Sequence, residues 1–235
     1  MKVKMSDDYK KYYSDVFYID ESSIYIDNNE NIMKIYKHKR NYNQREKVIK
    51  RLFKKQSEVK KSDFPQDIIY LDDDIIGVVV KKYPDAKHLY DLYTTESIFK
   101  IIKILKDLNN NIKELCDNQI YYVSLKTDDV LVDELVHIIN FDNNRIDIMK
   151  KTNEIRENKC YRMVYNIILS YIRFLLDTND VTIFKDINKT YDVVNKELYF
   201  YNYDSINDFL NMLTNNIVDD KKELSLTLLN KVKKY

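Results

Sequence analysis

Glycine and proline are scarce in this chain. Its 235 residues include one glycine, Gly77, and two prolines, whereas soluble proteins ordinarily contain about 7% glycine and about 5% proline. A phosphate-covering loop of the type G-x-G-x-x-G needs several glycines, because its backbone turns tightly and approaches the anion closely. The sequence therefore excludes a loop of that type.

Cysteine is scarce as well. The two cysteines, Cys116 and Cys160, have no C-x-x-C neighbour and no spacing typical of metal ligands. The first five residues, Met-Lys-Val-Lys-Met, lack the apolar segment of a secretory signal peptide. These features predict an intracellular, cytoplasmic protein in a reducing setting.

The chain has almost no net charge and no long apolar run. Its 39 basic and 38 acidic residues nearly cancel, so it lacks the excess of positive charge that is typical of nucleic-acid binding. The longest apolar stretch, from Tyr165 to Leu176, is interrupted by polar residues and is shorter than the roughly 20 residues that span a bilayer. We therefore expect neither a nucleic acid nor a membrane as a partner.

Tyr, Asn, Asp, Lys and Ile are abundant in place of glycine and proline. AT-rich codons encode these residues, which is typical of the genomes of large DNA viruses, phages and low-GC bacteria. From this composition we expect a viral source, and in that case a location in the host cytoplasm.

The N-terminal part of the chain has the alternating apolar pattern and the turn residues of a small antiparallel sheet. Val48, Ile49, Leu52 and Phe53 recur at spacings of three and four, which predicts a helix within residues 43–60. Five strands are expected, at residues 16–19, 23–26, 32–36, 67–71 and 75–80.

The pattern changes after Tyr83, where amphipathic helices take over. Two short apolar strands interrupt them, joined by a turn at Asp133 and Glu134. A chain of this length suits one domain, with an internal boundary near Tyr83. The expected helices lie at residues 97–118, 158–177, 205–214 and 222–232, and the two strands at 130–132 and 136–139.

The most informative pattern lies between Tyr121 and Asp142. Residues 121–133 read Tyr-Tyr-Val-Ser-Leu-Lys-Thr-Asp-Asp-Val-Leu-Val-Asp, and residues 140–142 read Asn-Phe-Asp. In protein kinases a catalytic loop H-R-D-L-x-x-x-N leads into a short strand, and a second short strand then delivers the motif D-F-G. The chain resembles this catalytic core with its reactive residues changed.

The resemblance implies an α+β protein with the two-lobed fold of protein kinases. Residues 1–83 would form an N-terminal lobe with an antiparallel five-strand sheet and one helix. Residues 84–235 would form a mainly helical C-terminal lobe. The two lobes together would make one kinase-like domain that covers nearly the whole chain.

Three residues match nucleotide-binding positions of the family. Lys34, on the third expected strand, matches the lysine of V-A-I-K, and Glu46, on the following helix, matches the glutamate that pairs with it. Lys126 continues the catalytic loop in a common Leu-Lys pattern. Judged from the residues alone, Lys34 and Glu46 are also explained as a strand lysine and a solvated helix charge.

The catalytic positions of the family are altered. Ser124 stands at the position of the catalytic base, and a serine hydroxyl is not basic at neutral pH. Asp129 replaces the metal-binding Asn, while Asn140 and Asp142 replace the Asp and the Gly of D-F-G. Either Asp129, Asn140 and Asp142 still bind Mg²⁺, or the acids are ordinary loop residues, which is the interpretation that we favour.

Three functions stay open. The first is a pseudokinase, a catalytically impaired domain that needs no cofactor and binds or regulates a protein partner, either a kinase or a host factor. The second is a divergent phosphotransferase that uses ATP and Mg²⁺, and the third is an unrelated α+β interaction protein. We favour the first and do not expect an enzyme, because the glycine loop, the base and the D-F-G aspartate are all missing.

Overall fold

The computed structural model describes most of the chain. The described residues are 3–4, 16–19, 22–26, 31–36, 42–57, 59, 64–71, 74–139, 141, 146–149, 151–177 and 201–217. Asn140, Asp142 and the helix expected at residues 222–232 lie outside them.

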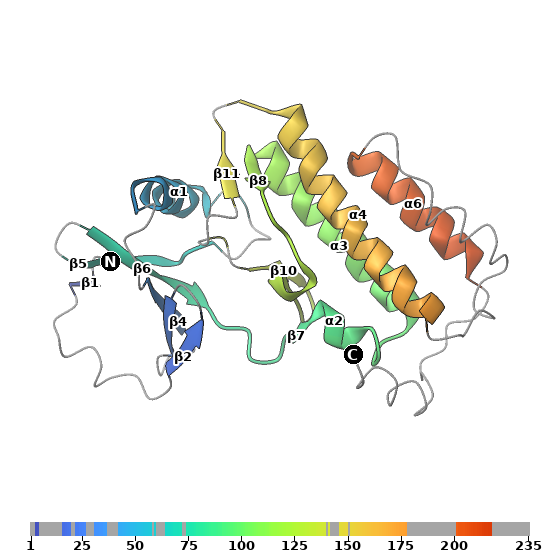
Figure 1. Cartoon of the computed structure of the whole chain (residues 1–235), viewed down its shortest axis with the longest axis horizontal. Coiled ribbons are helices and arrows are strands. Elements are labelled where there is room, and N and C mark those ends of the chain that lie inside the picture. The colour runs from blue at the N-terminus through green and yellow to red at the C-terminus, as the bar shows by residue number, and fades with distance from the viewer. Residues whose placement is uncertain are drawn as a thin grey trace.

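The protein is α+β, with small sheets and several helices, as the sequence predicts (Figure 1). A large sheet and α1 occupy one side of the view, and the long helices α3, α4 and α6 occupy the other. In chain order the elements are β1 (Val3–Lys4), β2 (Val16–Ile19), β3 (Ser22–Ile26), β4 (Asn31–Tyr36), α1 (Tyr42–Lys55), β5 (Asp67–Leu71), β6 (Asp74–Lys81), β7 (Lys87–His88), α2 (Leu89–Leu92), α3 (Ile98–Asp117), β8 (Ile120–Tyr122), the 3-10 helix η2 (Thr127–Asp129), β9 (Val130–Val132), β10 (Val136–Ile138), β11 (Ile146–Ile148), α4 (Glu154–Asp177) and α6 (Tyr203–Asn216).

The largest sheet has six strands in the order β1-β5-β6-β4-β3-β2. Its strands pair antiparallel except β1, which runs parallel to β5 with Val3 opposite Ile69. The expected antiparallel sheet of five strands is therefore wrong in strand number and in one pairing. A two-residue strand such as β1 is too short to show an alternating pattern.

Two smaller sheets lie further along the chain. One has three strands in the order β10-β9-β7, and the other pairs β11 with β8. The hairpin expected around the turn at Asp133 and Glu134 is confirmed, because β9 and β10 pair antiparallel with Val132 opposite Val136. Strands β7, β8 and β11 were not expected from the sequence, since each has only two or three residues.

Helix α1 covers one face of the large sheet. The apolar stripe that predicts this helix places Ile49 in a buried cluster with Tyr36, Ile68 and Val78 of the sheet. On the next turn of the same stripe, Leu52 belongs instead to the main core of the protein. Helix α1 therefore packs against both the sheet and the rest of the chain.

The main core lies between α3, α4, α6 and the short strands that follow α3. Helix α3 begins at Ser97, whose hydroxyl accepts a hydrogen bond from the Lys100 backbone N–H. Helix α6 lies along α3 and α4 (Figure 1). Apolar residues at helical spacing on all three helices supply most of the buried side chains.

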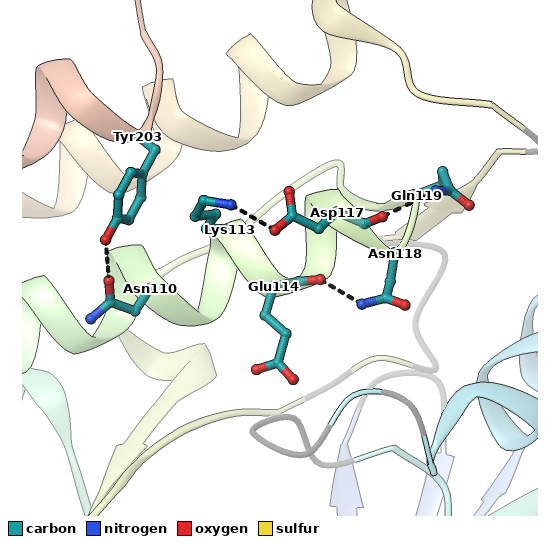
Figure 2. A network of polar contacts seen from close by, with 7 residues as sticks. All are labelled: Asn110, Lys113, Glu114, Asp117, Asn118, Gln119 and Tyr203. Carbon is teal, nitrogen blue, oxygen red and sulfur yellow. Dashed lines mark hydrogen bonds and ion pairs between the residues drawn. The ribbon is translucent and has the colours of Figure 1, made fainter.

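Polar contacts fasten the start of α6 to α3. The Tyr203 hydroxyl donates to Asn110 Oδ1 at 2.7 Å, as Figure 2 shows. The Asn109 side chain donates to the Tyr203 carbonyl oxygen at 3.1 Å. The ammonium group of Lys113 lies 5.7 Å from the centre of the Tyr203 ring. Tyr203 therefore fixes the position of α6 along α3 through its backbone, its ring and its hydroxyl.

Helix α3 ends in a left-handed residue that redirects the chain into β8. Gln119 has a φ of 57°, and its N–H donates to the Cys116 carbonyl oxygen. The Asn118 side chain donates to the Glu114 carbonyl oxygen at 2.9 Å, and that of Gln119 to the Asp117 carbonyl oxygen at 3.0 Å (Figure 2). These bonds satisfy carbonyl groups that the helix end leaves unpaired.

This helix end yields a prediction about Gln119. We expect Gln119→Gly to have a free energy of unfolding about 1 kcal/mol higher than Gln119→Ala, because only glycine adopts positive φ without steric cost. Both variants lose the side-chain bond to Asp117, so they form a matched pair, and urea unfolding measures the difference. Equal stability of the two variants would contradict a strained Gln119.

The only glycine of the chain lies in the middle of the large sheet. Gly77 on β6 is opposite Ile35 of β4 and Ile69 of β5. A Cβ atom built on Gly77 would lie 2.2 Å from the Lys34 carbonyl oxygen and 3.1 Å from Ile35 Cδ1. The first distance is far below van der Waals contact, so β4 and β6 approach closely only because this residue has no side chain.

We expect Gly77→Ala to lower the free energy of unfolding by about 1–3 kcal/mol, because the strands must separate to admit the methyl group. Urea unfolding with an unchanged slope would measure this loss. Ile35→Val is the matched control, since it removes Cδ1 and leaves the Lys34 backbone in place. If Ile35→Val rescued the stability of Gly77→Ala, the side chain rather than the backbone would impose the glycine.

Candidate functional site

The loop that carries the kinase-like pattern begins at β8, which is fully buried. All three residues of β8 are buried, and the strand pairs with β11 and packs against α3 and α4. The Tyr122 hydroxyl donates to the Ile139 carbonyl oxygen at 2.8 Å. Tyr122 therefore joins the start of the loop to the residue directly before Asn140.

Phe141 is the middle residue of the Asn-Phe-Asp motif, and it packs on the same tyrosine. Its buried ring lies 5.1 Å from the Tyr122 ring and 4.8 Å from the Phe64 ring, centre to centre. Phe64 precedes β5 of the large sheet. The structure thus brings together the end of β8, Phe141 after β10 and Phe64 between α1 and β5.

Asp129 is a structural residue of this loop. It is 1% exposed, and its Oδ2 accepts a hydrogen bond from the Lys126 backbone N–H at 2.9 Å. Its own N–H donates to the Lys126 carbonyl oxygen, and its carbonyl oxygen accepts from the Ile139 N–H at 2.9 Å. Asp129 therefore stabilises the turn η2 and holds it against the end of β10.

The loop residues before η2 alternate between the core and solvent. Leu125 is buried, and its N–H points to Met163 Sδ at 3.1 Å. Ser124 is half-buried and Lys126 is exposed. At the position that the resemblance assigns to the catalytic base, Ser124 presents a hydroxyl, which donates and accepts hydrogen bonds but does not take up a proton at neutral pH.

Lys34 and Glu46 lie on facing elements. Lys34 is buried in β4 opposite Val78, and residues directly opposite in a sheet share a face. Val78 packs against α1, so Lys34 is on the face that α1 covers. Glu46 is half-buried on α1 and forms an ion pair with the exposed Lys50 one turn further along.

Two cationic side chains of α1 form hydrogen bonds with segments outside the large sheet. The Arg51 guanidinium donates to the Ile148 carbonyl oxygen at 3.0 Å, and the Lys55 ammonium donates to the Asn118 carbonyl oxygen at 2.9 Å. These bonds join α1 to β11 and to the end of α3. No local pattern in the sequence predicts either bond.

A second polar cluster joins Tyr83 to the β9–β10 hairpin, and sequence reasoning missed it. His137 Nε2 lies 3.0 Å from Asp133 Oδ1, and its ring lies 4.0 Å from the Tyr83 ring, centre to centre. Burial alone would raise the pKa of Asp133, but hydrogen bonds from the Leu135 N–H and from His137 outweigh it and lower that pKa. The Lys81 ammonium lies 5.0 Å from the centre of the Tyr83 ring.

The expected metal ligands are placed only in part. Asp129 lies in the described part of the chain, whereas Asn140 and Asp142 do not. Within the described residues, no three or more His, Cys, Asp or Glu side chains gather as a metal ion requires. The Mg²⁺ alternative therefore stays a prediction, and the engagement of Asp129 Oδ2 with the loop backbone is the observation that bears on it.

Comparisons with known proteins do not assign a family. The chain matches no model of a protein family, and it matches no curated protein. Among the described helices, none is both long enough and apolar enough to cross a membrane. The cytoplasmic location and the viral source stay predictions from the composition.

Asp129 and its neighbour Asp128 provide a matched test of this loop. We expect Asp129→Ala to lower the free energy of unfolding by about 1–3 kcal/mol, because it removes a buried side chain and the carboxylate that accepts the Lys126 N–H bond. Asp128 is exposed, so Asp128→Ala should change stability by less than about 0.5 kcal/mol. Urea unfolding with and without Mg²⁺ measures both variants.

The dependence on Mg²⁺ separates a structural carboxylate from a metal ligand. A structural Asp129 gives the same loss of stability in both conditions. If Mg²⁺ stabilised the wild-type protein but not Asp129→Ala, the carboxylate would be a metal ligand instead.

Proposed function

We propose that this chain is a catalytically impaired protein-kinase-like domain, a pseudokinase, which binds or regulates a protein partner. The loop from Ser124 to Asp129 carries the proposal. Its base position holds a serine, and the carboxylate at its metal position is buried and bonded to the loop backbone. Phosphoryl transfer needs a carboxylate that aligns the substrate hydroxyl and ligands that hold Mg²⁺. In this loop the Asp129 carboxylate instead accepts a hydrogen bond from the Lys126 backbone N–H.

The order and contacts of the elements support the kinase-like arrangement. A sheet with one helix precedes a mainly helical part, and a buried strand, a loop and a hairpin separate α3 from α4. In this proposal residues 1–83 form an N-terminal lobe and residues 84–235 a C-terminal lobe. The boundary falls between β6 and β7, at the segment whose Tyr83 packs on His137.

The partner is proposed to be a protein, either a kinase or a host factor. Two large apolar side chains within the segment that carries the loop are open to solvent: Val123 is 51% exposed and Leu135 is 67% exposed. Val123 directly follows β8, and Leu135 lies in the turn between β9 and β10. Exposed apolar side chains of this kind are suited to contacts with another protein.

Two alternatives remain as proposals. A divergent phosphotransferase that uses ATP and Mg²⁺ is supported by Lys34, which lies buried on the sheet face that α1, the helix with Glu46, covers. An unrelated α+β interaction protein is supported by the same coarse fold, since fold alone does not establish function. The first alternative requires nucleotide binding, and the second requires none.

A melting experiment with nucleotide tests the proposal. We expect millimolar ATP with Mg²⁺ to leave the Tm unchanged and no γ-phosphate to be transferred to the chain or to water. A nucleotide bound at 100 times its Kd would stabilise the fold by about 2.7 kcal/mol, which raises the Tm of a chain this size by roughly 5–10 °C. Detection of phosphate transfer would overturn the pseudokinase proposal.

Lys34→Met is the variant that assigns any shift, because methionine keeps the buried stem of the side chain and removes the ammonium group. Lys47→Met, at an exposed position of α1, is its control. A shift that Lys34→Met abolishes and Lys47→Met preserves would support the phosphotransferase alternative. A shift that both variants preserve would place the nucleotide away from Lys34.

A further inference from the structure

Two sulfur atoms of α4 contact the backbone where β8 leads into the loop of the candidate site. The Cys160 thiol donates a hydrogen bond to the Tyr122 carbonyl oxygen at 3.4 Å. One turn further along α4, Met163 Sδ accepts a hydrogen bond from the Leu125 N–H at 3.1 Å. Residues three positions apart share a face of a helix, so one face of α4 fastens the backbone of residues 122–125 through both sulfur atoms.

The two sulfur atoms differ in their access to solvent. Cys160 is 1% exposed, whereas Met163 is half-buried at the rim of the core. Val123, two residues before Leu125, is 51% exposed, so the loop runs along the protein surface here. A thioether carries no proton, so its sulfur is nucleophilic at neutral pH without an activating group, whereas a thiol must first ionise. Met163 is therefore the sulfur of this contact that a small oxidant can reach.

We propose that Met163 is a site of reversible oxidation, and that its sulfoxide releases the loop between β8 and η2 from α4. The oxidant is a hydroperoxide such as hydrogen peroxide. The proposal concerns the attachment of the loop to α4 and does not depend on the pseudokinase function.

The reaction transfers one oxygen atom to sulfur. The Met163 thioether attacks an oxygen atom of hydrogen peroxide, so an S–O bond forms as the O–O bond breaks. The departing hydroxide takes the proton of the transferred oxygen and leaves as water. Sulfur loses two electrons and the peroxide gains them, and the product is methionine sulfoxide. A methionine sulfoxide reductase, with a thiol as the reductant, restores the thioether and releases the oxygen as water.

Oxidation is incompatible with the hydrogen bond that this sulfur accepts. An oxygen atom added on the side of Leu125 does not fit between two atoms that are 3.1 Å apart. An oxygen atom added on the other side draws electron density away from sulfur, which is only a weak acceptor as a thioether. In both cases the Leu125 N–H loses this acceptor. Because Leu125 is 7% exposed, its backbone must move before water or the sulfoxide oxygen can replace the lost bond.

Release of Leu125 changes the residues that the loop presents to solvent. Ser124 directly precedes Leu125, and the exposed Val123 precedes Ser124. At the other end of the loop, the Asp129 carboxylate still accepts the bond from the Lys126 N–H. The change should therefore stay within residues 123–126.

The experiment uses the full chain, labelled at leucine with a heavy nitrogen isotope and treated with hydrogen peroxide in native buffer. Peptide mass spectrometry locates the methionines that gain one oxygen atom, and NMR measures hydrogen exchange at single leucine amides. We expect Met163 to be oxidised well before Met33, which is 7% exposed in β4. Exchange at Leu125 should then be about 2–10 times faster, because the lost bond weakens its protection. Exchange at Leu105, in the middle of α3, should not change.

Met163→Leu is the test variant, because leucine keeps a similar volume and removes the sulfur atom. In this variant exchange at Leu125 should be fast from the start, and peroxide should not change it. Met149→Leu is the matched control, since Met149 is 37% exposed, and its loop should respond to peroxide as the wild-type loop does. The two methionine sulfoxide reductases, one for each epimer, should restore slow exchange in the oxidised wild-type chain.

Four results would overturn the proposal: oxidation of Met163 no faster than that of Met33, oxidised Met163 with unchanged exchange at Leu125, a response of Leu125 to peroxide in Met163→Leu, or faster exchange that the reductases do not reverse. The main measurement uses the wild-type chain, so it stands even if a variant fails to fold.

Discussion

The burial of β8 between α3, α4 and β11 is the constraint on which the candidate site depends. A buried strand must satisfy each of its polar groups within the protein, because water cannot reach them. The Tyr121 hydroxyl accepts a hydrogen bond from the Asn153 N–H, the Tyr122 hydroxyl donates to the Ile139 carbonyl oxygen, and the Tyr122 carbonyl oxygen accepts from Cys160. These partners come from two segments, the start of α4 and the end of β10, so Tyr121 and Tyr122 of β8 set the positions of both.

The need of buried polar groups for hydrogen-bond partners also determines the role of Asp129. A buried carboxylate is costly unless hydrogen bonds compensate for its lost hydration, and here the Lys126 N–H supplies one. The bond orders the loop and occupies an oxygen that a metal ion would otherwise use. In the proposed pseudokinase, with Ser124 at the position that the resemblance assigns to the base, this loop would keep the shape of a catalytic segment without its chemistry. Such a loop would suit the proposed role in binding a protein partner.

Much of the order of helices and strands could be predicted from the sequence, because the local spacing of apolar residues indicates each long element. The stripe that includes Ile49 and Leu52 predicts α1, and the turn at Asp133 and Glu134 predicts the β9–β10 hairpin, which the structure confirms. The short strands β1, β7, β8 and β11 were missed, because two or three residues show no period. The contact between His137 and Tyr83 joins residues more than 50 positions apart, and no local pattern marks it.

Asp128 and Asp129 show that the sequence does not determine the burial and the hydrogen-bond partners of a residue. By itself it showed two adjacent acids in a loop that resembles the kinase pattern, with Ser124 where the resemblance expects the base, and a single glycine, which cannot form a phosphate-covering loop. Only the tertiary structure decided that Asp129 is buried and bonded while its identical neighbour faces solvent. The physical reason is that side-chain periodicity is local, whereas burial and hydrogen-bond partners depend on which distant segments, here α2, β7 and the end of β10, pack against each residue.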